Sequence, residues 1–332
     1  MVKKHLKEIV RKYNTEDKES FDYVLTQNER NLPLPENLYN KFISNISFRD
    51  ISFYPNLDPL KTKIKEYVKC NNIFLVPGSD VGIKTIFEML DLKGKEVLTT
   101  NYFFPMYKVY SEIYQAKIVT ANYSTFNFNI YELFEKINKD TQLIIIANPN
   151  SPIGDTYTLD QIRTILDRGI TTVIDEAYIE LSDAKSAVEL IEEYDNLYVT
   201  RTFSKGFGAA GCRVGYICSN EQNIGMLDKL RLMFEVSGIA AKYCSFILDN
   251  IEYYQEYLKD LLSEKKKFIR KLEMKHNFRI FDTKSSWFFL QKNRETEKFI
   301  EENNINLRET KLDFLDNSIW FKFNYDLKFN GK

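Results

Sequence analysis

Histidine is nearly absent from this chain of 332 residues, in which His5 and His276 are the only two. We therefore expect neither a histidine-based catalytic triad nor a histidine-rich metal site. If the protein is an enzyme, a lysine becomes the leading candidate for its general base. Long apolar runs are also missing, so no membrane span is expected. The 46 basic and 47 acidic residues nearly cancel, which gives no basis for a nucleic-acid groove.

Cysteine is sparse as well. The four cysteines, Cys70, Cys212, Cys218 and Cys244, form no C-x-x-C pair and no metal-ligand spacing. The amino end is polar and does not resemble a secretory segment, so these residues are typical of reduced thiols in a protein core. The sequence thus predicts a cytoplasmic protein without a metal site.

Short apolar runs alternate with helical patterns in the middle of the chain. Strands are predicted near 142–147, 171–174 and 196–200, and helices near 158–168 and 185–194. This alternation predicts a mainly parallel sheet wrapped on both faces by helices, with ligands bound beyond the carboxyl ends of the strands. The polar residues at those ends are Asn150, Ser151, Asp175, Tyr178, Ser204 and Lys205.

The stretch TRTFSKGFGAAGCRVGY, residues 200–216, follows the third of these strands. A lysine just past a buried strand, followed by small residues and then Arg213, suits an anionic cofactor that bonds an amine and carries a phosphate. Taken alone, the stretch is equally typical of a surface lysine in a flexible turn.

Two further segments offer groups for such a cofactor. A helix is predicted to begin near Ser79 and Asp80, where backbone N–H groups and the Ser79 hydroxyl can hold a phosphate, although either residue could be a plain N-cap. The cluster Tyr102, Phe103, Phe104 and Tyr107 could stack on a flat ring or simply pack a strand–helix junction.

Together these groups suit pyridoxal 5′-phosphate. An aspartate keeps the pyridine nitrogen protonated, a tyrosine and an asparagine bond the phenolate oxygen, and a lysine closes the imine. The chain resembles the fold-type I pyridoxal-phosphate enzymes, specifically class I/II aminotransferases similar to histidinol-phosphate aminotransferase. The matching runs are FYPNLDPLK, PGSDVGI, FFPMY, NPNSPIG, VIDEAY, RTFSKGFGAAGCRVGY and NLRE, in the family's order.

The resemblance implies a role for each matching residue. Lys205 would be the Schiff-base lysine and proton shuttle, Asp175 would pair with the pyridine nitrogen, and Tyr178 would bond the phenolate oxygen. Tyr54 would reach the phosphate of the neighbouring subunit, which implies a homodimer. The remaining implied residues are Phe104 for ring stacking, Ser79, Asp80, Thr202, Ser204 and Arg213 for the phosphate, and Arg308 for the substrate. Asn28 is a further candidate for the substrate, because its loop before Pro33 could reach a cleft, although such a position is more often an ordinary polar turn.

Three positions depart from the family pattern. Ser151, preceded by Asn150, replaces the asparagine that bonds the phenolate oxygen, and either residue could serve. Phe104 replaces a tyrosine. Trp320 falls where the family has a second substrate-binding arginine, and Lys322 lies two residues on, on the same strand face. A bidentate guanidinium clamp is therefore expected to be missing, and lysine does not reproduce its geometry.

The sequence predicts an aminotransferase acting on a small polar, phosphorylated or sugar-derived substrate. The alternative is a decarboxylase of a phosphorylated amino acid, and a third reading is a binding protein without activity. We expect three parts: a mostly helical segment 1–30 that joins the small domain, a cofactor-binding domain 31–225, and a linking helix with a small α+β domain 226–332.

Overall fold

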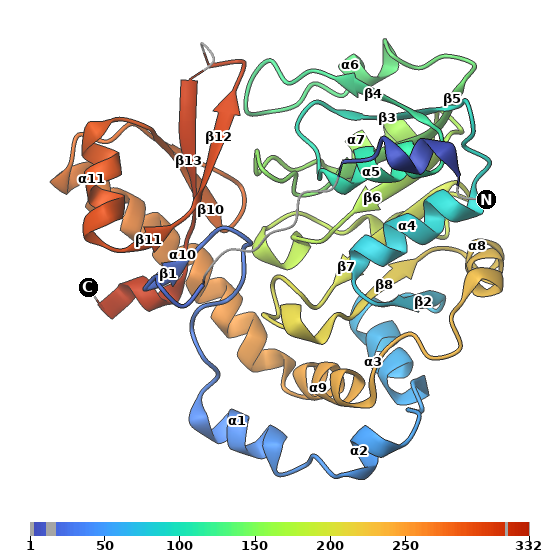
Figure 1. Cartoon of the computed structure of the whole chain (residues 1–332), viewed down its shortest axis with the longest axis horizontal. Helices are drawn as coiled ribbons and strands as arrows, with labels where there is room; N and C mark the ends of the chain where they lie inside the picture. Colours follow the sequence, from blue (N-terminus) through green and yellow to red (C-terminus); the bar gives the residue numbers. More distant parts are fainter. Residues whose placement is uncertain (1–2, 11–17, 316–317, 332) are drawn as a thin grey trace.

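A computed structural model describes residues 3–10, 18–315 and 318–331. The larger part of the molecule is a seven-stranded sheet with helices on both faces. The smaller part is a four-stranded antiparallel sheet packed on helices α10 and α11 (Figure 1). The predicted α/β fold with a smaller α+β domain is confirmed. No helix in these ranges is both long and apolar enough to cross a membrane.

The large sheet has the strand order β2–β8–β7–β6–β5–β3–β4. Strand β8 is antiparallel to both of its neighbours, and the other pairings are parallel. The strands are β2 (Ile73–Val76), β3 (Glu96–Thr100), β4 (Lys117–Ala121), β5 (Thr141–Ala147), β6 (Thr171–Asp175), β7 (Leu197–Thr202) and β8 (Gly215–Cys218).

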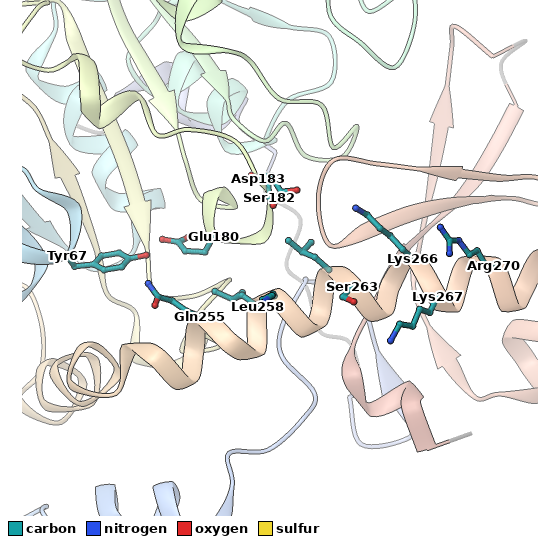
Figure 2. Close-up of a pocket in the computed structure, with 12 residues that line it drawn as sticks. Tyr67, Glu180, Ser182, Asp183, Gln255, Leu258, Ser263, Lys266, Lys267 and Arg270 are labelled. Atoms are coloured by element: carbon teal, nitrogen blue, oxygen red, sulfur yellow. The ribbon is translucent and has the colours of Figure 1, made fainter.

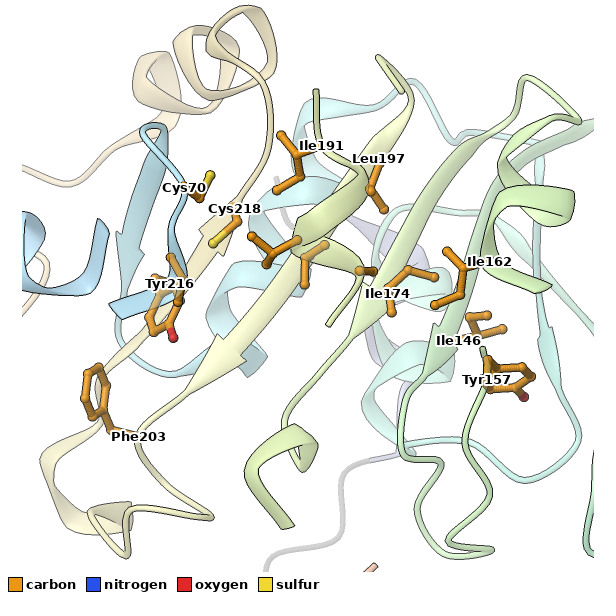
Figure 3. Packing of buried hydrophobic residues seen from close by; sticks show 14 of the residues in the cluster. Cys70, Ile146, Tyr157, Ile162, Ile174, Ile191, Leu197, Phe203, Tyr216 and Cys218 are labelled. Carbon is orange, nitrogen blue, oxygen red and sulfur yellow. The ribbon is translucent and has the colours of Figure 1, made fainter. Parts of the chain in front are cut away.

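Successive side chains of the central strands enter two different cores. Ile144 and Ile146 of β5 pack with helices α3, α7 and α9, whereas Leu143 and Ile145 pack with α4, α5 and α8. Figure 3 shows part of the first core, where Ile146, Ile162 and Ile174 meet. The unbroken apolar runs therefore reflect a sheet covered on both faces. These helices are α3 (Asp58–Val68), α4 (Ser79–Met89), α5 (Met106–Ile113), α7 (Leu159–Leu166), α8 (Glu221–Leu227) and α9 (Gly238–Asp249).

The small sheet has the order β12–β13–β10–β9. Helix α10 connects the two parts, since its Tyr254 packs in the core of the large sheet and its Leu261 in that of the small one (Figure 1). The elements are β9 (Ile280–Asp282), β10 (Trp287–Gln291), β12 (Arg308–Leu312), β13 (Ser318–Asn324), α10 (Ile251–Lys275) and α11 (Arg294–Glu302).

The amino-terminal segment differs from the expectation. Within residues 3–10 and 18–30 the structure contains a single 3-10 turn, η1 (Lys4–Lys7), and a short strand, β1 (Tyr23–Val24); residues 11–17 lie outside the described ranges. The prediction of a mostly helical segment is wrong there, because a polar segment without an apolar stripe gives a helix nothing to pack. Strand β1 instead pairs in parallel with β11 (Ile305–Asn306), which supports the proposed attachment of this segment to the small domain.

The remaining elements are short. Helices α1 (Glu36–Ile43) and α2 (Arg49–Ser52) precede α3, and α6 (Tyr131–Phe134) follows β4. The region 185–194, where a helix was predicted, holds only the 3-10 turn η3 (Ala187–Leu190). Other 3-10 turns are η2 (Ile179–Leu181), η4 (Ala210–Cys212), η5 (Asp228–Leu230) and η6 (Leu327–Gly331).

Candidate active site

The carboxyl ends of β5, β6 and β7 lie side by side. In the parallel register Ala147 is opposite Asp175, and Asp175 is opposite Thr200. The loops that leave these ends carry Ser151, Tyr178 and Lys205, so strand register alone brings the predicted groups to one edge of the sheet.

Asp175 is the buried acid of this edge. Its Oδ2 accepts a hydrogen bond from Tyr107 Oη at 2.7 Å, and its Oδ1 accepts from Thr200 Oγ1 at 3.0 Å and from the backbone N–H of Ala177 at 3.2 Å. Burial raises the pKa of the Asp175 carboxyl, and these hydrogen bonds oppose that rise because they favour the charged form. The sequence assigned no direct role to Tyr107.

Lys205 points toward the amino-terminal segment. Its Nζ donates to the carbonyl oxygen of Gln27 at 2.6 Å and lies 5.6 Å from the centre of the Tyr178 ring. Tyr178 Oη in turn accepts a hydrogen bond from Asn28 Nδ2 at 2.9 Å. Gln27 and Asn28, which belong to the amino-terminal segment, therefore contact the predicted lysine and tyrosine.

Beside this lysine, Gly78, Ser79, Arg213 and Gly215 lie close together and leave little room for further side chains. We call this group the cradle. Helix α4 begins at Ser79, directly after Gly78, which has a φ of +89°. A Cβ on Gly78 would lie 2.5 Å from Arg213 Nη2, and a Cβ on Gly215 would lie 2.5 Å from the backbone nitrogen of Ser79. The guanidinium of Arg213 thus approaches the start of the helix, which is the arrangement that binds a phosphate.

The hydroxyls predicted for the phosphate line the same cradle. Arg213 Nη1 donates to Ser204 Oγ at 3.2 Å, and Thr202 Oγ1 donates to Ser204 Oγ at 3.0 Å. Asp80 accepts a hydrogen bond from Tyr110 at 2.5 Å, so its carboxylate is engaged with helix α5.

The two candidates for the phenolate oxygen have different surroundings. Asn150 Nδ2 donates to the carbonyl oxygen of Tyr102 at 2.8 Å, and its Oδ1 accepts from the N–H of Ile153. Ser151 Oγ instead accepts from Lys322 Nζ at 3.4 Å. The Asn150 amide therefore links its own loop to the loop of Tyr102, and Ser151 faces the group of site residues. On the other side, the exposed ring of Phe104 meets Tyr107 edge-on, with centroids 5.8 Å apart.

On the substrate side, Trp320 was expected at the position of the family's second arginine. It is buried in the core, where its indole donates to Ser318 Oγ. Lys322 is the residue that reaches the site, because it contacts Asn28 and Ser151 and lies opposite the exposed Arg308 in the β12–β13 pair. The pairing of these strands, which the sequence does not reveal, fixes this register.

Other features lie apart from this edge. Tyr54 is 80% exposed and stacks on Phe234 with centroids 4.1 Å apart. A groove of about 620 Å³ runs along α10 between Tyr67 and Arg270 and is lined by none of the predicted residues (Figure 2). Across the described part of the chain, no group of three histidine, cysteine, aspartate or glutamate residues could hold a metal ion.

Comparison with known proteins identifies the family of the chain. Residues 23–326 match the family described as aminotransferase class I and II. The chain belongs to this family. Among the curated relatives of this aminotransferase is a histidinol-phosphate aminotransferase of Christiangramia forsetii, which is 33% identical over 263 residues, 75% of this chain and 74% of the relative.

Solved structures give the same fold. The histidinol-phosphate aminotransferase of Sinorhizobium meliloti in complex with pyridoxal-5′-phosphate has a TM-score of 0.80 at 19% identity, covering 92% of this chain and 87% of that one. The L-threonine-O-3-phosphate decarboxylase of Porphyromonas gingivalis has a TM-score of 0.75 at 18% identity, covering 93% and 96%. At these identities the likeness shows the fold alone.

The site of this aminotransferase fits pyridoxal phosphate. Its lysine, its buried hydrogen-bonded aspartate and the cradle that a Cβ at position 78 or 215 would fill match the three chemical parts of that cofactor, which are the aldehyde, the ring nitrogen and the phosphate. The predicted enzyme class and cofactor are confirmed: the protein is a pyridoxal-phosphate-dependent aminotransferase.

Proposed function

We propose that this aminotransferase transfers an amino group to or from a small phosphorylated compound, and that Lys205 is the residue that bonds its cofactor. The observation that carries the proposal is the meeting of Lys205, Asp175 and Tyr178 at adjacent strand ends, beside the cradle of Gly78 and Arg213. Together these groups offer a partner for the aldehyde, the ring and the phosphate of pyridoxal phosphate.

The cofactor, when bound, supplies an electron sink next to the substrate Cα. Asp175 is the residue proposed to keep its ring nitrogen protonated, and the hydrogen bonds from Tyr107 and Thr200 favour the charged form of the carboxylate and orient it. Lys205 Nζ, once free of the cofactor, would accept the proton from the substrate Cα and deliver it to the cofactor carbon that the lysine had bonded.

Two sets of side chains are proposed to hold the cofactor, one at its phenolate oxygen and one at its phosphate. Tyr178, held by Asn28, and Ser151 are proposed to bond the phenolate oxygen of the cofactor. Ser79, Thr202, Ser204 and Arg213 are proposed to hold its phosphate, with the amino end of α4 adding backbone donors.

The proposed substrate class is supported by two observations. The curated relatives are named for histidinol phosphate, a phosphorylated amino alcohol. On the substrate side of the site, Arg308 and Lys322 are neighbours across the β12–β13 pair, and both are separate from the cofactor cradle. A pair of basic side chains apart from the cradle suits a second anionic group, as a phosphorylated substrate would have.

A donor screen tests the proposal. The cofactor-loaded protein is mixed with histidinol phosphate or with unphosphorylated histidinol, and the visible absorption of the bound cofactor is followed. We expect the absorption to be lost with the phosphorylated donor, at concentrations at least about tenfold lower than with histidinol, because the phosphate adds charge-assisted hydrogen bonds. A protein whose absorption no amino donor changes would contradict the proposal.

The role of Lys205 has its own test. The Lys205→Ala variant should lose turnover and the borohydride-reducible link to the cofactor while it keeps its fold. The matched control is Lys108→Ala, whose side chain is 62% exposed on helix α5. A borohydride-reducible link that persists at full level in Lys205→Ala would refute the assignment.

Decarboxylation of a phosphorylated amino acid was the alternative expected from the sequence. Its support is the likeness of fold to the threonine-phosphate decarboxylase, which does not distinguish the two reactions. The donor screen separates them, since carbon dioxide release without transfer of the amine would identify a decarboxylase. A binding protein without activity would show neither carbon dioxide release nor transfer of an amine.

We further propose a homodimer. Tyr54 and its stacking partner Phe234 lie among large exposed apolar side chains that a second copy would cover. These neighbours are Phe48, Ile51, Phe53, Leu232 and Met233. In such a dimer Tyr54 would enter the site of the partner subunit. A cytoplasmic location remains part of this proposal, and cell fractionation tests it.

A further inference from the structure

Trp287 is a fully buried tryptophan on strand β10 of the small sheet. Successive side chains of this strand point to opposite faces, so Phe288 and Leu290 pack in the core of the small sheet. Trp287 and Phe289 instead pack with residues of the large sheet. The indole of Trp287 therefore extends from the small domain into the large one.

The indole N–H of Trp287 donates across the boundary between the domains. Its Nε1 donates to the carbonyl oxygen of Pro152 at 2.7 Å, and Pro152 directly follows Ser151. The other tryptophan of the chain, Trp320, donates to Ser318 Oγ of its own strand. A buried indole N–H needs an acceptor, and either arrangement supplies one. What distinguishes Trp287 is that its acceptor belongs to the loop of a residue proposed to bond the cofactor.

The loop that carries Ser151 is attached to the small domain at two of its carbonyl groups. The N–H of Gly154 donates to the carbonyl oxygen of Asn150 at 2.7 Å, which closes the loop on itself. Besides the bond from Trp287 to Pro152, the N–H of Lys284 donates to the carbonyl oxygen of Gly154 at 3.1 Å. The position of Ser151 therefore depends on where the small domain holds this loop.

The same indole contacts Tyr178. The two rings meet edge-to-face at 75°, with centroids 5.2 Å apart. Tyr178 Oη accepts a hydrogen bond from Asn28, so the side chain is held at its ring by Trp287 and at its hydroxyl by Asn28. One buried side chain thus contacts the loop of Ser151 and the ring of Tyr178, which are the two residues proposed to bond the phenolate oxygen.

We propose that Trp287 is a positioning residue for the cofactor, and that its N–H and its ring set the directions in which Ser151 and Tyr178 offer their hydroxyls to the phenolate oxygen. The inference rests on the proposed function, which supplies the roles of those two residues. It goes beyond that function because it assigns their geometry to a side chain of the other domain. A shift of the small domain would therefore reach the cofactor through this indole.

The absorption of the bound cofactor reports this geometry without turnover. Its visible band changes with rising pH as the link between cofactor and lysine loses a proton. Donors on the phenolate oxygen make that proton easier to lose, because they share the negative charge that attracts it. A phenolate oxygen with weaker donors should keep the proton to a higher pH, so the pH midpoint of the band measures the hydrogen bonds to this oxygen.

The Trp287→Phe variant keeps an aromatic ring beside Tyr178 and beside Lys322, whose Nζ lies 4.0 Å from the centre of the Trp287 ring, and it removes the N–H. We expect the midpoint to rise by about half a pH unit or more. Trp320→Phe is the matched control, since it removes a second buried indole whose hydrogen bond stays within β13. A merely structural role would lower the melting temperature and leave the midpoint unmoved. An unchanged midpoint in Trp287→Phe, or an equal rise in the control, would overturn the proposal.

Double variants show which residues Trp287 acts through. Ser151→Ala and Tyr178→Phe should each raise the midpoint, and Trp287→Phe should add less than its own rise to at least one of them. Full additivity with both would place the effect of Trp287 elsewhere and refute the inference. If neither Ser151→Ala nor Tyr178→Phe moves the midpoint, the proposed phenolate partners are wrong and the inference falls with them. If they move it and Trp287→Phe does not, the inference alone fails.

An isosteric replacement covers the case in which Trp287→Phe does not fold. Trp320→Phe protein is expressed with benzothienylalanine in place of tryptophan, so that position 287 keeps the shape of the indole and loses the N–H. The same rise of the midpoint is expected, relative to Trp320→Phe protein that contains ordinary tryptophan. An unchanged midpoint in this protein would equally overturn the proposal.

Discussion

Tyr107 Oη donates a hydrogen bond to Asp175 Oδ2 at 2.7 Å, and both side chains are buried. Tyr107 belongs to helix α5 and Asp175 to the end of β6, so the bond joins a helix to the edge of the sheet where the cofactor is proposed to bind. Burial raises the pKa of Asp175, and Tyr107 is one of the groups that favour its charged form.

Replacing this tyrosine should weaken cofactor binding. A Tyr107→Phe variant keeps the ring and loses the donor, so a charge-assisted hydrogen bond worth about 1.5–3 kcal/mol disappears. We expect the dissociation constant for pyridoxal phosphate to rise roughly tenfold to a hundredfold by spectroscopic titration. Tyr114→Phe is the control, since its hydroxyl donates to the exposed Glu88 at 3.4 Å. Equal affinities in the two variants would show that Tyr107 does not support Asp175.

Gly78 should be required for phosphate binding more than for folding. An alanine at Gly78, where φ is +89° and ψ is 152°, enters a backbone region open essentially to glycine alone, at a cost of about 1–3 kcal/mol. It also displaces the Arg213 guanidinium, whose Nη2 would lie 2.5 Å from the new Cβ. Gly94→Ala, at a φ of +75° with nothing within 4 Å, is the control with a positive φ and no clash. We expect both variants to fold, with weaker binding of the cofactor in Gly78→Ala alone. A Gly78→Ala protein with undiminished cofactor affinity would contradict the cradle.

The proposed exchange of Tyr54 between subunits can be measured by mixing. Lys205→Ala and Tyr54→Ala subunits should each be poorly active alone. If Tyr54 enters the partner's site, a mixed dimer contains one complete site, so an equal mixture should recover about a quarter of the activity of the unmodified dimer. The mixture is refolded together and assayed by rate per subunit. No recovery, in a mixture shown by mass spectrometry to contain mixed dimers, would place Tyr54 outside the partner's site.

Glu176 should make the stability of the protein depend on pH. Burial raises the pKa of this carboxyl to about 7 from its ordinary value of 4.5, although Arg201, Ser186 and the N–H of Ala187 oppose the rise. Between these values the folded state holds a proton that the unfolded state has lost. The free energy of unfolding should therefore fall by up to about 3 kcal/mol as the pH rises from about 5 to about 7, and the contribution should be constant above that.

The Glu176→Gln variant isolates this effect, because its amide does not titrate. Urea unfolding of both proteins at several pH values between about 5 and 8 should give a flatter profile for the variant. Matching slopes in the two proteins would assign the pH dependence to other groups.

Much of the site could be predicted because its parts are local in sequence. Asp175, Tyr178 and Lys205 each follow an apolar run directly, and the parallel register then brings them together. The start of α4 at Ser79 could also be predicted, because Gly78 directly precedes a helical pattern in the sequence.

What could not be predicted depends on contacts between distant segments. The direction of the Tyr107 side chain follows from how α5 packs on the sheet, and the approach of Lys322 to Asn28 follows from the pairing of β12 with β13. Strand β12 itself, Arg308–Leu312, is a polar edge strand without an apolar run to reveal it. The same unseen strand pair sets the register of β13, so the sequence does not tell whether Trp320 or Lys322 faces the site.

The contact between Asn28 and Lys322 joins positions 294 residues apart. During synthesis the ribosome produces Asn28, Asp175 and Lys205 well before Lys322. The segment of Asn28 also pairs through β1 with β11, Ile305–Asn306, which is made late as well. The contacts of Gln27 and Asn28 with Lys205 and Tyr178 should therefore form only after these carboxyl-terminal strands have left the ribosome.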